Sequence, residues 1–257
     1  MVPLDFAKLK AFFRDESNNE VHVCTTLQAL RWRLTRVSAS MRRSTLTSFV
    51  HFDLLEIETA EVPTKRVFDI LFFSQSVKVK EYVIAFLNSL ANEYQGRSYL
   101  LCYENIVALL IETLYNEGGE DSYLRQNALG TLQKFSLRKA AQTAMIEGGV
   151  IAWIVQILKS SQDYLSDYSM EYATALLMNL SLRNRGKDEC EKLMDQVNIL
   201  KVLSDMMEHD NLQVRTHVNG TLYSVLTRPS LKQQANALGM MDMLMYLMKS
   251  SDEQMQR

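Results

Sequence analysis

The segment Glu171-Tyr-Ala-Thr-Ala-Leu-Leu-Met-Asn-Leu-Ser-Leu-Arg183 decides the fold of this chain. Its apolar residues recur at intervals of three and four, which is the spacing of one broad face of an α-helix. These apolar residues are Ala173, Leu176, Leu177 and Leu180. We therefore expect one amphipathic helix here, with Asn179 and Arg183 four residues apart on another face.

The same pattern returns on both sides of this segment at an interval of 45 residues. A small residue recurs at Ala85, Gly130, Ala175 and Gly220. Two residues later comes a leucine, at Leu87, Leu132, Leu177 and Leu222. A large apolar residue follows at Leu90, Phe135, Leu180 and Val225, and shorter helices keep the interval at Leu109, Ile154, Ile199 and Leu244. Four columns in register indicate a repeat protein.

A helical repeat of roughly 40–47 residues is typical of armadillo and HEAT proteins. One helix pair or triplet cannot bury its apolar face alone, so neighbouring repeats stack and the leucine columns form one continuous core. We predict an all-α, armadillo/HEAT-like α-solenoid of about four repeats over residues 64–257. Residues 1–63 fit the interval poorly and are expected to form a helical N-terminal cap or a degenerate repeat.

Composition agrees with an all-α protein. Only 9 Gly and 3 Pro in 257 residues leave few turns for a β-sandwich or barrel. The net charge of −2 gives no general case for binding nucleic acid. Three distant cysteines indicate free thiols in a reducing compartment. With no signal peptide and no membrane span evident, we expect the cytoplasm or cytoskeleton.

Several segments resemble one known family in their loops as well as in their apolar columns. These segments are Leu132–Arg138, Gln142–Gly149, Leu165–Tyr168, Glu171–Arg183 and Val218–Ser224. From Arg42 to the C-terminus, and most strongly over residues 124–226, the chain resembles the LisH-domain, armadillo-repeat-containing proteins of cilia and basal bodies. The LisH dimerisation motif of that family is not visible in residues 1–40, so dimerisation is not carried over.

The resemblance implies a non-catalytic scaffold at the basal body, ciliary base or axoneme. Its partners would be ciliary or axonemal proteins in microtubule-associated complexes, with tubulin or other acidic segments among them. The alternative is a cytosolic armadillo-type adaptor or regulatory subunit unrelated to cilia, because one fold hosts many functions. We expect no catalytic residues, cofactor, metal site or small-molecule substrate, since the sequence has no phosphate loop, nucleophile elbow or metal-ligand spacing.

Armadillo proteins that hold extended peptides resemble one another in a Trp and an Asn, four residues apart, on the groove side of the third helix. In this sequence the small column, which includes Ala175, occupies the Trp position. The Asn position reads Ser89, Lys134, Asn179 and Ser224. Because only Asn179 matches, we do not expect this ladder to bind a nuclear-localisation peptide.

Two basic groups are candidates for binding protein partners. Lys134, Arg138, Arg183 and Arg228 are predicted to line one side of the solenoid. They would bind acidic segments through charge-assisted hydrogen bonds. Alternatively, the arginines cap the C-terminal carbonyls of their own helices.

The second basic group comprises Arg31, Arg33, Arg36, Arg42 and Arg43, with Trp32 among them. It would bind an acidic protein surface, or else pair with the acidic segment Asp53–Glu61. Nucleic acid is disfavoured for a chain with this net charge.

Methionines crowd the last expected helix, which covers residues 238–248. Methionine adapts to irregular contact surfaces, and an end repeat of a solenoid should otherwise be polar outside. We therefore predict a contact surface that includes Met241 and Met245, covered by a partner or by further repeats. The alternative is that these methionines belong to the core.

Overall fold

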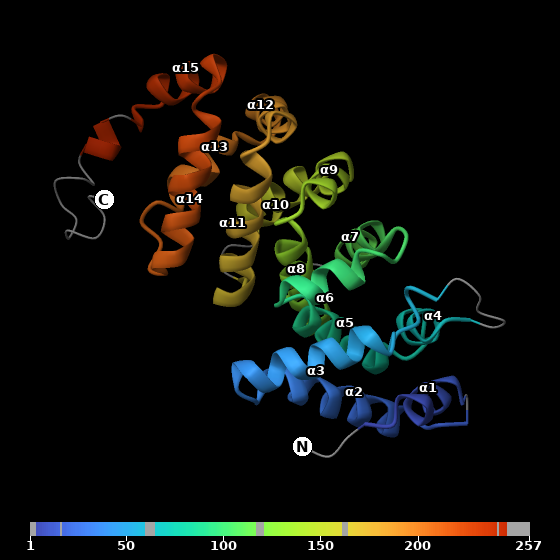
Figure 1. Ribbon diagram of the computed structural model, residues 1–257. Helices are drawn as coiled ribbons and strands as arrows, with labels where there is room; N and C mark the ends of the chain where they lie inside the picture. Colours follow the sequence, from blue (N-terminus) through green and yellow to red (C-terminus); the bar gives the residue numbers. More distant parts are fainter. Residues whose placement is uncertain are drawn as a thin grey trace. The chain divides into compact units, whose positions relative to one another are not determined.

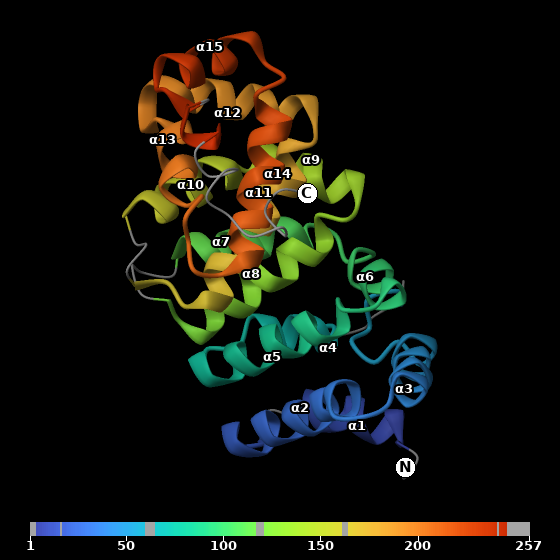
Figure 2. The same cartoon turned by 90° about the vertical axis from the view of Figure 1, so that its left-hand side faces the viewer.

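A computed structural model describes residues 4–15, 17–59, 65–116, 121–160, 164–240 and 242–245. Within these residues the regular structure is helical, as Figures 1 and 2 show. The helices of the first part are α1 (Phe6–Arg14), α2 (Glu20–Thr35), α3 (Ala39–His51), α4 (Val67–Phe72), α5 (Val77–Leu90), α6 (Tyr94–Leu100), α7 (Ile106–Asn116) and α8 (Tyr123–Phe135). They are followed by α9 (Lys139–Glu147), α10 (Val150–Ser160), α11 (Asp167–Ser181), α12 (Asn184–Val197), α13 (Ile199–Asp205), α14 (Leu212–Val225) and α15 (Pro229–Ala237).

The helices fall into triplets, and this confirms the armadillo-type α-solenoid predicted from the sequence. The triplets are α3–α5, α6–α8, α9–α11 and α12–α14, and α15 begins another. The first helices α6, α9, α12 and α15 start at residues 94, 139, 184 and 229, which are 45 apart. The chain forms two compact units, residues 1–135 and 136–257, so the boundary falls between two triplets.

The third helix of each triplet carries most of the core. In the first unit α2 packs on α5 and α5 packs on α8, and in the second unit α11 packs on α14. The two leucine-rich columns are at most 3% exposed, from Leu87 and Leu90 through to Leu222 and Val225. Burying a leucine side chain stabilises the fold by about 1.5–3 kcal/mol, so these columns account for much of the stacking energy.

The first helix of each triplet is not evident from the apolar pattern of the sequence. The apolar spacing of residues 77–94 predicts one helix, whereas α5 ends at Leu90 and α6 begins at Tyr94. Similarly, the opening segment ends its helix at Ser181, and Arg183 is the N-cap of α12. Pro229 is the first residue of α15, where its missing N–H costs nothing.

Glycine allows the tight corner between a third helix and the next first helix. A Cβ on Gly96 would lie 1.9 Å from the carbonyl oxygen of Leu90, and one on Gly186 would lie 2.0 Å from that of Leu180. The intervening connections contain neither Gly nor Pro. The sequence pattern therefore runs through the corner without a visible break.

The first triplet departs from the 45-residue interval because of one longer connection. Helix α3 begins 55 residues before α6, and the extra residues lie between α3 and α4. Asp53 organises this segment by accepting hydrogen bonds from the main-chain N–H groups of residues 57–59 and from Tyr99. Glu56 binds Arg14 of α1 at 2.6 Å and the N–H of Val67 in α4. The predicted boundary between residues 63 and 64 lies outside the described residues.

Cys24 and Cys190 are buried free thiols and Cys102 is exposed. Of the helices described, none is by itself long and apolar enough to cross a membrane. The pair α9 and α10, bent by 66°, passes that test together on length and composition alone.

Candidate protein-binding surfaces

The small-residue column lies where neighbouring third helices approach one another. Ala85, Gly130 and Ala175 are buried, and Gly220 is half-buried. A Cβ added to Gly220 of α14 would lie 2.6 Å from the Sδ atom of Met178 in α11. In this chain the position held by Trp in peptide-binding armadillo proteins therefore serves close helix packing.

The Asn column is occupied by hydrogen bonds within the protein. Lys134 donates to the main-chain oxygen of Asn88 at 3.1 Å and also to its side-chain oxygen. Asn179 donates to the hydroxyl of Ser136 at 2.8 Å, and Ser224 donates to the main-chain oxygen of Ser181 at 2.7 Å. Each of these groups binds a residue at or just beyond the end of an earlier third helix, rather than facing a ligand.

Lys134 is held in an environment that disfavours its charge. Burial, together with the positive charge of Arg97, lowers its pKa to about 8. Its ammonium is directed at Asn88, whose amide in turn donates to Asn127 at 2.9 Å. In the structure, Lys134 joins α8 to α5. Its membership in a basic binding strip stays a prediction.

The arginines of the predicted strip lie at the start of helices, not at the end. Arg138, Arg183 and Arg228 are the N-cap residues of α9, α12 and α15, and all three are half-buried. Arg228 reaches back to α12, where it binds the carbonyl oxygen of Asn184 at 3.1 Å and the carboxylate of Asp188. Arg183 reaches back to Gln142 of α9 at 3.4 Å.

For Arg183 and Arg228 the expected capping of their own helices is therefore wrong. Their guanidinium groups join successive first helices, because the 45-residue repeat places each N-cap beside the preceding triplet. Binding of acidic segments by the strip stays a prediction.

The N-terminal arginines take different positions. Arg42 donates to the carbonyl oxygen of Leu34 at 2.8 Å and lies 3.6 Å from Glu93. Arg43 is exposed, and Arg33 is half-buried. The expected pairing with the acidic segment 53–61 is wrong for two of its members: the buried Glu56 binds Arg14, and the half-buried Asp53 accepts a hydrogen bond from Tyr99.

Arg31 and Arg36 border a groove that the sequence did not reveal. Arg31 donates to the hydroxyl of Tyr123 at 2.9 Å, and the guanidinium of Arg36 lies 4.3 Å from the centre of the Trp32 ring. The groove has a volume of about 530 Å³. It is lined by Gln28, Arg31 and Trp32 from α2, by Lys78, Glu81 and Tyr82 from α5, and by Tyr123 from α8. Lys78 and Tyr123 are 45 residues apart, so they occupy equivalent positions in successive repeats. This interval is the sequence feature that could have indicated the groove.

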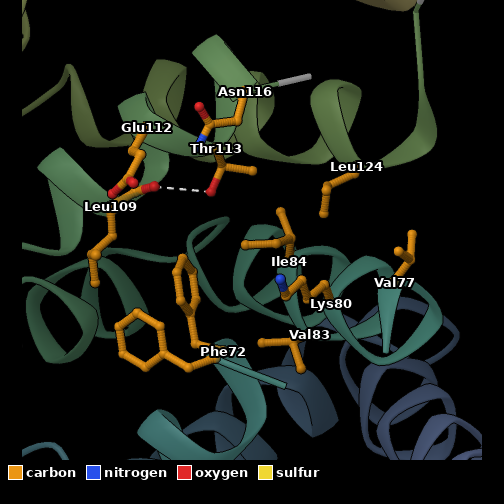
Figure 3. Close-up of a pocket in the computed structure, with 11 residues that line it drawn as sticks. Phe72, Val77, Lys80, Val83, Ile84, Leu109, Glu112, Thr113, Asn116 and Leu124 are labelled. Carbon is orange, nitrogen blue, oxygen red and sulfur yellow. Dashed lines mark hydrogen bonds between the residues drawn. The ribbon is translucent and has the colours of Figure 1, made fainter. Parts of the chain in front are cut away.

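A second hollow, of about 260 Å³, lies among α4, α5, α7 and α8. Figure 3 shows Phe72, Val83 and Ile84 on one side and Leu109, Glu112 and Thr113 on the other. The hydroxyl of Thr113 is already bonded to the carbonyl oxygen of Leu109 at 2.8 Å. The walls are mainly apolar, with Lys80 and Glu112 as the charged groups.

At the other end of the described chain, the predicted methionine surface is only partly visible. Met241 lies outside the described residues. Met245 is 52% exposed, whereas Met240 is buried against the hollow that includes Tyr223 and Leu226. A contact role for Met241 and Met245 stays a prediction.

No cluster of three or more His, Cys, Asp or Glu suited to a metal ion occurs within the described part of the chain. His217 is half-buried beside the Thr174 hydroxyl at 3.3 Å, and His209 accepts a hydrogen bond from the N–H of Asn211. Burial lowers the pKa of His217.

Comparison with known proteins confirms the expected resemblance. Residues 145–257 match the family model for the armadillo repeats of LisH domain-containing protein ARMC9. The Bos taurus protein of that name is 43% identical over 232 residues, which is 90% of this chain and 34% of the relative. The Homo sapiens protein is 42% identical over 232 residues, covering 90% of this chain and 28% of the relative. The Danio rerio protein is 38% identical over 255 residues, which is 99% of this chain and 30% of the relative.

The chain thus spans about a third of the length of these curated relatives. Solved structures of low sequence identity share its fold. A computationally designed armadillo repeat protein for modular peptide recognition has a TM-score of 0.74 at 14% identity, covering 98% of this chain and 95% of its own. An engineered protein has a TM-score of 0.70 at 17% identity, covering 99% of this chain and 93% of its own.

Proposed function

Since this chain is an armadillo-repeat protein that resembles LisH domain-containing protein ARMC9, we propose that it is a non-catalytic scaffold of the cilium or flagellum. It would act at the basal body or axoneme by binding other proteins in microtubule-associated complexes. The observation that carries this proposal is the identity of 42–43% over 232 residues. The designed armadillo proteins share the fold at 14–17% identity and say nothing of location.

A scaffold role suits the way the repeats use their polar groups. The buried side chains of Asn88 and Asn127 bond to one another between α5 and α8, and the half-buried Asn179 bonds to Ser136 just after α8, which stiffens each unit. A rigid stack of repeats presents an extended surface to partners and holds them at fixed spacing. Catalysis is no part of the proposal, and the repeat fold and the family resemblance support that choice.

Localisation in a ciliated cell tests the proposal. The chain is expressed as a fluorescent fusion at low level, and its signal is compared with markers of the basal body and axoneme. A designed armadillo repeat protein of the same size and tag is the control, because it has the fold without the family resemblance. We expect enrichment at the ciliary base or axoneme for this chain only.

Proximity labelling from the same fusion identifies the neighbours. Recovery of ciliary and axonemal proteins above the designed control supports the proposal. A diffuse signal with cytosolic neighbours would instead favour an armadillo-type adaptor unrelated to cilia. Equal enrichment of the designed control would show that the fold alone causes the localisation.

A further inference from the structure

The groove on the first unit is built by three helices that stack side by side. Helix α2 packs on α5, and α5 packs on α8, so the groove crosses the stack rather than following a single helix. Its aromatic residues come from all three helices: Trp32, Tyr82 and Tyr123. Trp32 and Tyr123 are each 42% exposed, and the guanidinium of Arg36 covers one face of the Trp32 ring.

The charges of this groove are unbalanced. Lys78 and Glu81 neutralise one another at 2.8 Å. Arg31 binds the neutral groups Gln28 and Tyr123, and Arg36 stacks on Trp32. Within the described residues, neither of these two guanidinium groups is in a salt bridge with a carboxylate. Among the residues that line the groove, Arg31 therefore keeps an unneutralised positive charge. Arg36 lies outside this lining and adds a second positive charge next to the groove, over the Trp32 ring.

The Asn column, which binds the peptide main chain in other armadillo proteins, is not available to a ligand in this protein. The groups of the Asn column are used between helices, as Lys134 and Asn179 show. A ligand in the groove must then be recognised through its side chains. Guanidinium groups bind carboxylates through paired hydrogen bonds, and aromatic rings bind apolar or aromatic side chains between them.

We propose that this groove binds an extended acidic peptide segment of a partner protein, with carboxylates at Arg31 and Arg36 and an apolar or aromatic side chain on Trp32 and Tyr123. This inference rests on the proposed scaffold function and names the partner chemistry of one surface. A nucleic acid is the weaker choice, because its phosphate backbone needs a longer run of cations, and Glu81 lies in the groove.

Peptide binding to the whole chain tests the assignment. The probe is a fluorescein-labelled peptide that alternates Glu with Gly around a central Tyr, and the comparison peptide has Gln in place of every Glu. We compare the Arg31→Gln/Arg36→Gln variant with Lys139→Gln/Lys159→Gln, a control with the same charge change at exposed basic residues outside the groove. Circular dichroism and thermal unfolding confirm that each variant is folded.

We expect the groove variant to bind the Glu peptide about tenfold more weakly than the control variant, which is the loss for about 1.4 kcal/mol of charge-assisted contact. The salt dependence of binding should fall as well. Equal affinity of the two variants, or equal affinity for the Gln peptide, would overturn the assignment. Stronger competition by single-stranded DNA than by unlabelled Glu peptide would replace it with a nucleic-acid site.

A second measurement does not depend on the arginine variants. The chain contains two tryptophans, so Trp153→Phe leaves Trp32 as the sole indole reporter. Addition of the Glu peptide should shift or quench the Trp32 emission, and the Gln peptide should not. An unchanged emission at saturating Glu peptide would contradict binding in this groove. Neither measurement depends on where the protein lies in the cell, so failure here leaves the ciliary proposal standing.

Discussion

The Nδ2 atom of Asn179 donates a hydrogen bond to the Oγ atom of Ser136 across 2.8 Å. One repeat later, Ser224 donates to the carbonyl oxygen of Ser181 across 2.7 Å. In both pairs the donor on a third helix reaches a residue 43 positions earlier, just beyond or at the end of the previous third helix. The residues that correspond to the peptide clamp of other armadillo proteins therefore join repeats to one another.

Asn179→Ala tests this role. The variant removes a hydrogen bond to a fully buried hydroxyl, and we expect it to lower the free energy of unfolding by about 0.5–1.5 kcal/mol. Equilibrium unfolding in urea gives the value. Ser89→Ala is the matched control from the same column, because the Ser89 hydroxyl donates within its own helix, to the carbonyl oxygen of Ala85. A larger loss for Ser89→Ala than for Asn179→Ala would contradict an inter-repeat role.

The glycines of α12 and α14 should differ in how strongly they respond to alanine. In Gly186→Ala the new Cβ meets the Leu180 carbonyl oxygen, which belongs to the backbone and cannot yield easily. We expect a loss of about 1–3 kcal/mol in unfolding free energy. In Gly220→Ala the new Cβ meets the end of the flexible Met178 side chain, and the gain in helix propensity offsets that contact.

The expected change for Gly220→Ala is therefore below about 1 kcal/mol in either direction. Thermal and urea unfolding of the two variants, measured side by side, provide the comparison. If Gly220→Ala proves the more damaging of the two, the α12 corner is not as tight as the Gly186 contact implies.

These contacts explain which parts of the fold the sequence revealed. The third helices were predictable because Leu177 and its equivalents recur at one interval and are buried in every repeat. The first helices were not, because corners such as 91–93 carry no Gly or Pro and the controlling glycine, Gly96, lies inside the next helix. The periodic apolar residues indicate which positions are buried. The turn between two helices depends instead on one close contact between their backbones, which leaves no periodic pattern.

The groove escaped prediction for a related reason. Trp32, Tyr82 and Tyr123 come from three helices, and only Lys78 and Tyr123 keep the repeat interval. Helix α2 is out of register because the connection between α3 and α4 is ten residues longer than the interval allows. The arginine cluster itself was visible in the sequence, but which arginines keep an unpaired charge depends on contacts with Gln28, Glu93 and Tyr123.

Lys134 should make the stability of the first unit depend on alkaline pH. Burial lowers its pKa from 10.5 to about 8 in the folded protein. Between pH 8 and 10.5 the unfolded chain therefore binds a proton that the folded chain does not, and stability from this group rises with pH. The contribution is at most about 1.4 kcal/mol per pH unit for one proton.

Lys134→Met removes that contribution at nearly unchanged side-chain length. The unfolding free energy is measured at several pH values between 8 and 10.5. With rising pH it should increase less, or decrease more, in the variant than in the unsubstituted protein. Burial raises the pKa of Cys190 to about 12 and that of Tyr103 to about 12, which gives the opposite slope in both proteins. The difference between the two proteins isolates Lys134, and identical slopes would contradict its displaced pKa.

Asp53 should control the insertion between α3 and α4. Burial raises the pKa of its carboxyl, but hydrogen bonds from Thr59, Tyr99 and the main chain outweigh this and lower it below 3.8. A lowered folded pKa means that the carboxylate stabilises the protein above about pH 4 and that this stability is lost as the pH falls through the folded pKa. Asp53 also adopts a φ of 46°, which Asn tolerates and Ala does not.

We therefore expect Asp53→Ala to lower the unfolding free energy at pH 7 by about 2–4 kcal/mol, through lost charge-assisted hydrogen bonds and backbone strain. Asp53→Asn should lose less, because it keeps one acceptor oxygen and the left-handed backbone. Hydrogen exchange at the amides of Ile57, Glu58 and Thr59 reports the local effect, since all three donate to the Asp53 carboxylate. Faster exchange at these amides, with α11 unaffected, is the expected pattern. Unchanged protection in Asp53→Ala would mean that the insertion is held by Glu56 and Arg14 instead.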